Sequence, residues 1–175
     1  AAGYGVLTAG LNIGGYGNPI PPGRLNRAEE YTGSAWTAGG TLSQARYNIG
    51  GGAGTQTSAA ACGGQGPSDK ESQTENYDGS SFTTGVSLPQ KIRGGRTAGT
   101  SDSSYIFWGG SAPPGAVGET LEFDGTAFTD LGADMGTAGS SAVCAGTTTA
   151  AINIMSGPPP GQNKTQQFNK SINTI

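Results

Sequence analysis

The sequence predicts an all-β chain folded as a β-propeller of about four blades, each a four-stranded antiparallel sheet. An aromatic residue followed by a short turn recurs at Tyr31, Tyr77, Phe123 and Phe168, at spacings of 46, 46 and 45 residues. Doublets of small residues keep the same period, as Gly14-Gly15, Gly63-Gly64, Gly109-Gly110 and Ser156-Gly157. No amphipathic helical pattern is evident. Units that repeat at this length bury their apolar faces by stacking, as the blades of a propeller do.

Four short strands are expected in each unit. The second is the most apolar, and we expect it to end at the doublet; it covers residues 6–13, 57–62, 104–108 and 150–155. The third ends at the repeated aromatic residue, where the Asp-Gly pairs at 78–79 and 124–125 predict hairpin turns of primed geometry. The fourth contains a second aromatic residue, which is Trp36, Phe82 or Phe128.

The first strand leads into a turn of small residues, as at 52–55, and is found only three times. Residues 1–5 align with that turn, so we expect the missing strand to precede residue 1. The chain also begins without methionine, which indicates a processed product or a piece of a longer protein. The expected organisation is one propeller domain or segment, 1–175, with repeats at 1–40, 41–86, 87–132 and 133–175.

A glycine doublet that closes an apolar strand, followed by an aromatic residue and a second aromatic residue after a turn, resembles the kelch repeat. The segments at 31–40 (Tyr-Thr-Gly-Ser-Ala-Trp-Thr-Ala-Gly-Gly), 45–46, 52–57 and 63–64 are more similar to the kelch-like repeats of tailed-bacteriophage structural proteins. The spacing between the two aromatic residues is shorter than in typical kelch repeats. This resemblance implies a virion structural role, as part of a tail fibre, a tail appendage or a decoration protein.

Composition and charge exclude several classes of partner. The net charge is −3 and the pI is about 4.8, so a nucleic-acid partner is not expected. No apolar run is long enough to predict a membrane span. Only 12% of residues are charged, which favours an extracellular or particle-bound protein.

The residue types argue against catalysis. The chain has no histidine, which removes Ser-His-Asp and Cys-His nucleophiles and the commonest metal ligand. A bridge between Cys62 and Cys144 is disfavoured, because they fall at different positions in their repeats. Carboxylates recur at equivalent positions, which favours structural roles over glycosidase chemistry. No enzyme activity, metal or cofactor is therefore expected, and a glycan-degrading enzyme using Glu122 ranks last.

The recurring aromatic residues are interpreted as packing between blades, so candidate recognition residues are sought where the repeat is broken. The connections after the doublets differ in length and composition and share one end of the propeller; they cover 16–27, 65–71, 111–118 and 158–164. Their candidate binding residues are Tyr16, Ile20, Arg24, Asp69 and Lys70. The alternative interpretation is that these segments are simple solvated connectors.

Two functions from different classes follow. The first is a non-catalytic virion structural protein that contacts host-surface glycan, other virion subunits or copies of itself. The alternative is a secreted bacterial carbohydrate-binding propeller, or a non-catalytic module of a larger extracellular enzyme. The expected locations are accordingly the phage particle or, in the alternative, the extracellular space.

Overall fold

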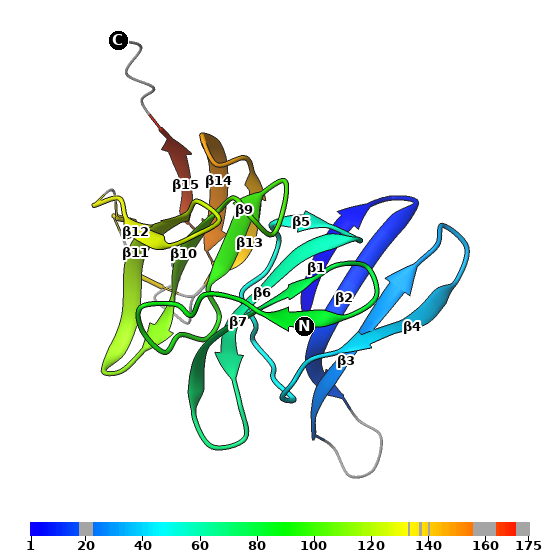
Figure 1. Cartoon of the computed structure of the whole chain (residues 1–175). Helices are drawn as coiled ribbons and strands as arrows, with labels where there is room; N and C mark the ends of the chain where they lie inside the picture. Colours follow the sequence, from blue (N-terminus) through cyan, green and yellow to red (C-terminus); the bar gives the residue numbers. More distant parts are fainter. Residues whose placement is uncertain (18–22, 133, 137, 140, 156–163, 171–175) are drawn as a thin grey trace.

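The computed structural model describes residues 1–17, 23–132, 134–136, 138–139, 141–155 and 164–170, and within these ranges it contains fifteen strands and no helix (Figure 1). The strands form four antiparallel sheets, in each of which strands that follow one another in sequence lie side by side. The sheets are the blades of a four-bladed β-propeller. The all-β fold class and the up-and-down blades predicted from the sequence are therefore confirmed.

The blades follow the sequence repeats. Blade 1 contains β1 (Ala2–Val6), β2 (Ala9–Gly17), β3 (Gly23–Tyr31) and β4 (Trp36–Thr41). Blade 2 contains β5 (Gly54–Thr55), β6 (Ser58–Gln65), β7 (Lys70–Tyr77) and β8 (Phe82–Thr84). Blade 3 contains β9 (Arg96–Gly99), β10 (Tyr105–Ala112), β11 (Gly115–Phe123) and β12 (Phe128–Asp130). Blade 4 contains β13 (Ser141–Gly146), β14 (Ala150–Met155) and β15 (Lys164–Asn169).

The second and third strands pair in the same register in every blade. The repeated aromatic residue lies opposite one position of the second strand, in the pairs Gly10–Tyr31, Ala59–Tyr77, Tyr105–Phe123 and Ala151–Phe168. Because strand register is fixed by which side chains face the core, the period in the sequence becomes a period in space. Residues at equivalent positions in different blades can therefore be compared directly.

The glycine doublets interrupt the second strand without ending it, so the predicted end of the strand is wrong. In blade 2 the register shifts between Cys62 and Gly64, and β6 then continues to Gln65. Gly63 and Gly64 have φ angles of +57° and +112°, which side chains disfavour. The doublet is thus a β-bulge that bends the strand. The Gly64 amide then donates to the Ile92 carbonyl at 2.8 Å, which ties the blade to the segment entering blade 3.

The same inter-blade hydrogen bond is repeated around the propeller. The amide of the second doublet glycine also donates from Gly15 to the Arg46 carbonyl at 2.9 Å, and from Gly110 to the Gly139 carbonyl at 3.0 Å. A bulge frees this amide from its own sheet, which leaves it available to the next segment of chain. The doublets therefore join successive blades through the backbone.

The prediction of a missing first strand is also wrong. Residues 2–6 form β1, which pairs with β2 from Ala2 opposite Ile13 to Val6 opposite Ala9. The small-residue segments that the sequence predicts as turns, such as 52–55, overlap the innermost strands of their blades. A Cβ on Gly52 would lie 2.6 Å from the Thr97 carbonyl oxygen. Where four blades converge, small residues are required for close approach. Among the described residues, the fourth strand is the one found three times.

The core consists of the junctions between successive blades. The first junction includes Tyr4, Leu11, Ile13, Ile49, Ala59 and Tyr77; the second includes Ala60, Cys62, Ile92, Tyr105, Phe107 and Phe123; the third includes Ala98, Ile106, Trp108 and Ala151. Phe82 and Phe128 pack against the first and second. The predicted packing role of the aromatic residues is confirmed in blades 2 and 3. It is wrong for Trp36, which is 57% exposed on blade 1.

Four residues, 78–81, connect β7 to β8, and Asp78 organises this turn. Its Oδ1 accepts hydrogen bonds from the amides of Ser80 and Ser81, each at 2.8 Å. The hairpin is confirmed, but the primed geometry is wrong. A type I′ turn would require positive φ angles at both Asp78 and Gly79, and only Gly79 has one, at +95°. The carboxylate replaces the missing strand partners of the turn amides, which is a typical Asx turn.

We expect these turns to make unfolding depend on pH in acid. Hydrogen bonds, first from the Ser81 amide, lower the pKa of Asp78 to about 2, and those from Thr126 lower the pKa of Asp124 to about 2. Both folded values lie below the unfolded value of about 3.9, so this stabilisation is complete above about pH 4 and is lost as the pH falls toward 2. The Asp78→Asn/Asp124→Asn variant should show a weaker fall in urea midpoint between pH 4 and 2. An unchanged pH profile would contradict this assignment.

Candidate functional site

The ends of the strands beyond the glycine doublets form one end of the propeller, which we call the loop end. It comprises the ends of β2 and β3 at Tyr16 and Arg24, the β6–β7 turn at 66–69 and the β10–β11 turn at 113–114. These connections lie on the opposite side from the β1–β2 and β3–β4 turns, because the strands of each blade run up and down. The structure therefore brings four of the sequence-predicted site residues, Tyr16, Arg24, Asp69 and Lys70, to one end.

Two of these residues belong to an aromatic and cationic cluster. Tyr16 and Arg24 lie opposite each other on β2 and β3, and Tyr16 is 63% exposed. The ring of Tyr16 meets that of Tyr47 edge to face, with centroids 5.6 Å apart. The Arg24 guanidinium carbon lies 5.6 Å from the centroid of the same Tyr47 ring, within the range of a cation–π contact. The Tyr16–Arg24–Tyr47 cluster is thus an exposed ring surface with an adjacent cation.

Sequence reasoning missed Tyr47, although a signal for it exists. Tyr47 pairs with Gln65 in an isolated bridge, and Arg93 pairs with Ser111 in the equivalent bridge one blade later. An aromatic residue therefore replaces a cation at a repeated position. Comparing equivalent positions for departures from the repeat would have identified it.

Asp69 and Lys70 form a separate group at the junction of blades 2 and 3. The Asp69 carboxylate pairs with Lys91 at 3.1 Å, and Lys70 Nζ donates to Ser111 Oγ at 3.3 Å. The hydrogen bond from the Lys70 amide, followed by that from Lys91, lowers the pKa of Asp69. Nearby, Arg93 donates to Gln65 Oε1 at 3.0 Å. These contacts fix the turn and do not bring Asp69 or Lys70 into the Tyr16–Arg24–Tyr47 cluster.

Ile20 lies outside the described residues. The predicted loops 65–71 and 111–118 are shorter in the structure, because β6 and β10 resume pairing after the bulge and reach Gln65 and Ala112. The connections are reduced to 66–69 and 113–114. In blades 2 and 3 the loop end is therefore formed by strand ends and tight turns instead of long variable loops.

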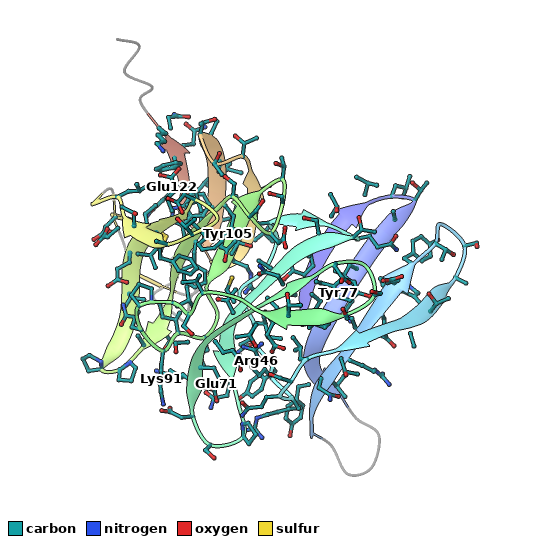
Figure 2. All side chains as sticks on the ribbon, in the orientation of Figure 1. Arg46, Glu71, Tyr77, Lys91, Tyr105 and Glu122 are labelled. Atoms are coloured by element: carbon teal, nitrogen blue, oxygen red, sulfur yellow. The ribbon has the colours of Figure 1, made fainter. Side chains whose placement is uncertain are left out.

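Charged side chains of both signs lie at the loop end. It holds Arg24, Lys70, Lys91 and Arg93, out of nine lysines and arginines in the sequence, together with Asp69 and Glu71. Figure 2 shows Lys91 and Glu71 at the lower end of the molecule and Glu122 at the upper end. Lys91 pairs with Asp69 at 3.1 Å, and at the upper end Lys170 pairs with Glu122 at 2.7 Å. Arg24 is the cation that lies beside the aromatic rings of the loop end.

A small cavity of about 250 Å³ lies where the innermost strands meet. Its lining includes Gly3, Gly52, Arg96 and Cys144, so all four blades contribute. Both cysteines are free; Cys62 is buried and Cys144 is half-buried. Burial raises the pKa of Cys62 to about 11 and that of Cys144 to about 12, so neither is a reactive thiolate at neutral pH.

Every carboxylate has a partner within the chain. Eight accept from backbone amides or pair with a cation, and the other four bond to neighbouring side chains; the full set is Glu29, Glu30, Asp69, Glu71, Glu75, Asp78, Asp102, Glu119, Glu122, Asp124, Asp130 and Asp134. The most buried, Glu75, pairs with Arg46 at 2.5 Å. Within the described ranges no three histidine, cysteine or acidic side chains gather into a cation-binding group. The acidic residues thus have structural partners at turns and blade junctions.

No protein-family model and no curated protein matches the chain. Among the residues that the structure describes, no helix is long and apolar enough to cross a membrane. The propeller fold is therefore established by the structure itself.

Proposed function

We propose that the chain is a non-catalytic structural protein of a tailed-phage particle, a propeller of a tail fibre, tail appendage or decoration protein that contacts host-surface glycan through its loop end. The virion location rests on the similarity of residues 31–40 and 52–57 to phage kelch-like repeats. The use of every carboxylate in structural contacts supports a scaffold over an enzyme.

The Tyr16–Arg24–Tyr47 cluster is the single observation that carries the recognition role. Aromatic rings offer an apolar face with a polar hydroxyl, which suits the two sides of a sugar ring. Arg24 supplies a cation with several hydrogen-bond donors, suitable for the acidic groups of a polysaccharide. The side chains project from the ends of paired strands, so the scaffold holds them in place with little ordering cost.

A secreted bacterial carbohydrate-binding propeller is the second candidate, because it would use the same loop end. The weakly charged polar composition fits an extracellular protein as well as a particle-bound one. The genes beside the coding sequence distinguish the two proposals. Neighbouring portal or tail genes favour the virion role, and neighbouring polysaccharide-utilisation genes favour the secreted one.

Glycan binding provides the direct test. We expect binding to acidic bacterial polysaccharide fragments on a glycan array, and about a fivefold weaker affinity for Tyr16→Ala, because one stacked ring contributes about 1 kcal/mol. Arg24→Gln should weaken the binding of acidic glycans more than the binding of neutral ones. Leu7→Ala is the matched control, since Leu7 is 90% exposed at the β1–β2 turn on the opposite end. Equal array profiles for all four proteins would overturn the proposed role of the loop end.

A further inference from the structure

Each blade has two faces, and each junction joins one face of a blade to the other face of the next. We call the face toward the following blade the leading face and the opposite one the trailing face. In the second strand of blade 1, Leu11 and Ile13 lie on the leading face and Gly10 and Asn12 on the trailing face. The three junctions of the chain are all of this leading-to-trailing type.

The leading face is buried in three blades and open in the fourth. The equivalents of Ile13 are Cys62 and Trp108, and all three side chains are at most 2% exposed. The equivalent residue of blade 4, Ile154, is 43% exposed, and Val143 opposite it on β13 is 55% exposed. An apolar side chain that is buried in each earlier blade is therefore left in solvent.

The trailing face shows the reverse distribution. The equivalents of Asn12 are Ala61, Phe107 and Asn153, and all three are at most 2% exposed. Asn12 itself is only half-buried, in a groove of about 580 Å³ on blade 1. The side chain of Trp36 is exposed beside this groove, whereas its equivalents Phe82 and Phe128 pack into junctions.

We propose that the leading face of blade 4 binds the trailing face of blade 1 in a second copy of this chain, which adds one more junction of the type that the chain already forms three times. The two open surfaces are the unpaired halves of one repeated interface, so each has the backbone geometry that the other requires. This interaction goes beyond glycan recognition at the loop end and does not depend on it.

The two faces are complementary in shape, with apolar side chains on one and a groove on the other that is lined by glycines, Trp36 and the Arg27-paired Glu29. The leading face of blade 4 has no charged residue among its described side chains, which are Val143, Ala145, Ala150, Ile152, Ile154, Thr165, Gln167 and Asn169. The trailing face of blade 1 has glycines in place of side chains at Gly3, Gly5 and Gly10, so it is hollow. Apolar side chains from one copy would fill the groove of the other and cover Trp36.

Association of this kind is head-to-tail, because different surfaces of the two copies meet. Whether the association closes into a ring or extends into a filament depends on the rotation between the copies. Both arrangements use the same junction. Either one would increase the particle mass with concentration.

Charged substitutions on the two faces provide the test. Gly3→Arg blocks the trailing face, and a Cβ at Gly3 meets no atom of the chain within 4 Å, so the substitution begins in open space. Ile154→Arg blocks the leading face, with Val143→Arg as a second variant of that face. Leu7→Arg is the control for an added charge at an exposed apolar site. Circular dichroism and thermal melting confirm that each variant is folded.

Light scattering coupled to size-exclusion chromatography measures the particle mass of each variant over about a hundredfold range of concentration. We expect wild type and Leu7→Arg to associate, and Gly3→Arg and Ile154→Arg to remain monomeric when alone. An equimolar mixture of these two variants should form a one-to-one dimer and nothing larger, since one intact face of each kind remains. A symmetric or non-specific contact would not produce this complementation, and its absence would overturn the proposal.

Trp36 fluorescence gives a second measurement on the same samples. Trp108 is buried, so an aqueous quencher such as iodide reaches only Trp36. Quenching of Trp36 should fall as wild type associates and should persist in Ile154→Arg. A wild-type chain that stays monomeric at every concentration overturns the proposal, and protection of Trp36 by a glycan in that monomer would reassign the groove to a ligand.

Discussion

Replacement of Arg46 by methionine is expected to destabilise the propeller by about 3–5 kcal/mol, because it leaves an unpaired carboxylate in the core. The Arg46 side chain is fully buried, and Glu75 is 3% exposed. The guanidinium donates to Glu75 at 2.5 Å and to the carbonyls of Gly63 and Gln73 at 2.9 and 2.8 Å. One side chain therefore pairs a charge and satisfies two carbonyl oxygens of blade 2.

The backbone of Arg46 belongs to the other side of the same junction. Its carbonyl accepts from the Gly15 amide at 2.9 Å, and its amide donates to the Leu25 carbonyl at 3.1 Å, so both groups bind blade 1. Figure 2 shows Arg46 between the blades that these bonds connect. Arg46 thus links blade 1 through its backbone to blade 2 through its side chain, and its loss affects the whole junction.

Urea unfolding followed by circular dichroism measures this loss. Arg27→Met is the matched control, because Arg27 pairs with Glu29 at 3.6 Å on the surface and such pairs contribute at most about 1 kcal/mol. The Arg46→Met/Glu75→Leu variant should recover part of the lost stability, since it removes the unpaired charge as well. A loss below about 1 kcal/mol for Arg46→Met would contradict the structural role assigned to this pair.

The period of the sequence predicted the blades because the same residues meet the same surroundings in each repeat. Tyr77 and Phe123 illustrate this: both end a third strand, both pair with the same position of the second strand, and both are buried at a junction. Local pattern and packing agree at these positions, and the fold class follows from them.

The strand boundaries could not be predicted in the same way. Two consecutive glycines are typical of a turn, and only the register shift between Cys62 and Gly64 shows that pairing continues beyond a bulge. Residues 1–5 likewise resemble a turn, because the crowding that requires small side chains arises only when four innermost strands converge. Both features depend on contacts between distant segments.

The candidate site could be predicted in part. Tyr16 and Arg24 could be predicted from the sequence because they lie where the repeat is broken. Tyr47 also departs from the repeat, but it lies in a connecting segment and was missed. The open faces could not be predicted, since Ile154 and Ile13 look alike in the sequence and differ only in how far they are covered in the structure.

Substitution of Gly63 by alanine is expected to destabilise the propeller by about 3 kcal/mol, because two independent costs combine at this residue. Its φ angle is +57°, where an L side chain costs about 1–2 kcal/mol. A Cβ there would also lie 2.4 Å from the Ile92 carbonyl oxygen and 3.0 Å from that of Glu71. Both obstacles are backbone atoms, so relief requires the junction between blades 2 and 3 to open.

Two other glycines separate these costs. Gly132 has a φ angle of +61° with no atom within 4 Å of its Cβ position, so Gly132→Ala should lose about 1 kcal/mol from backbone strain alone. Gly115 has neither a positive φ angle nor a nearby atom, and Gly115→Ala should change stability by less than about 1 kcal/mol. Urea unfolding should therefore rank the losses Gly63 > Gly132 > Gly115. A loss at Gly63 no larger than that at Gly132 would show that the doublet is required for its backbone angles and not for close approach of the next blade.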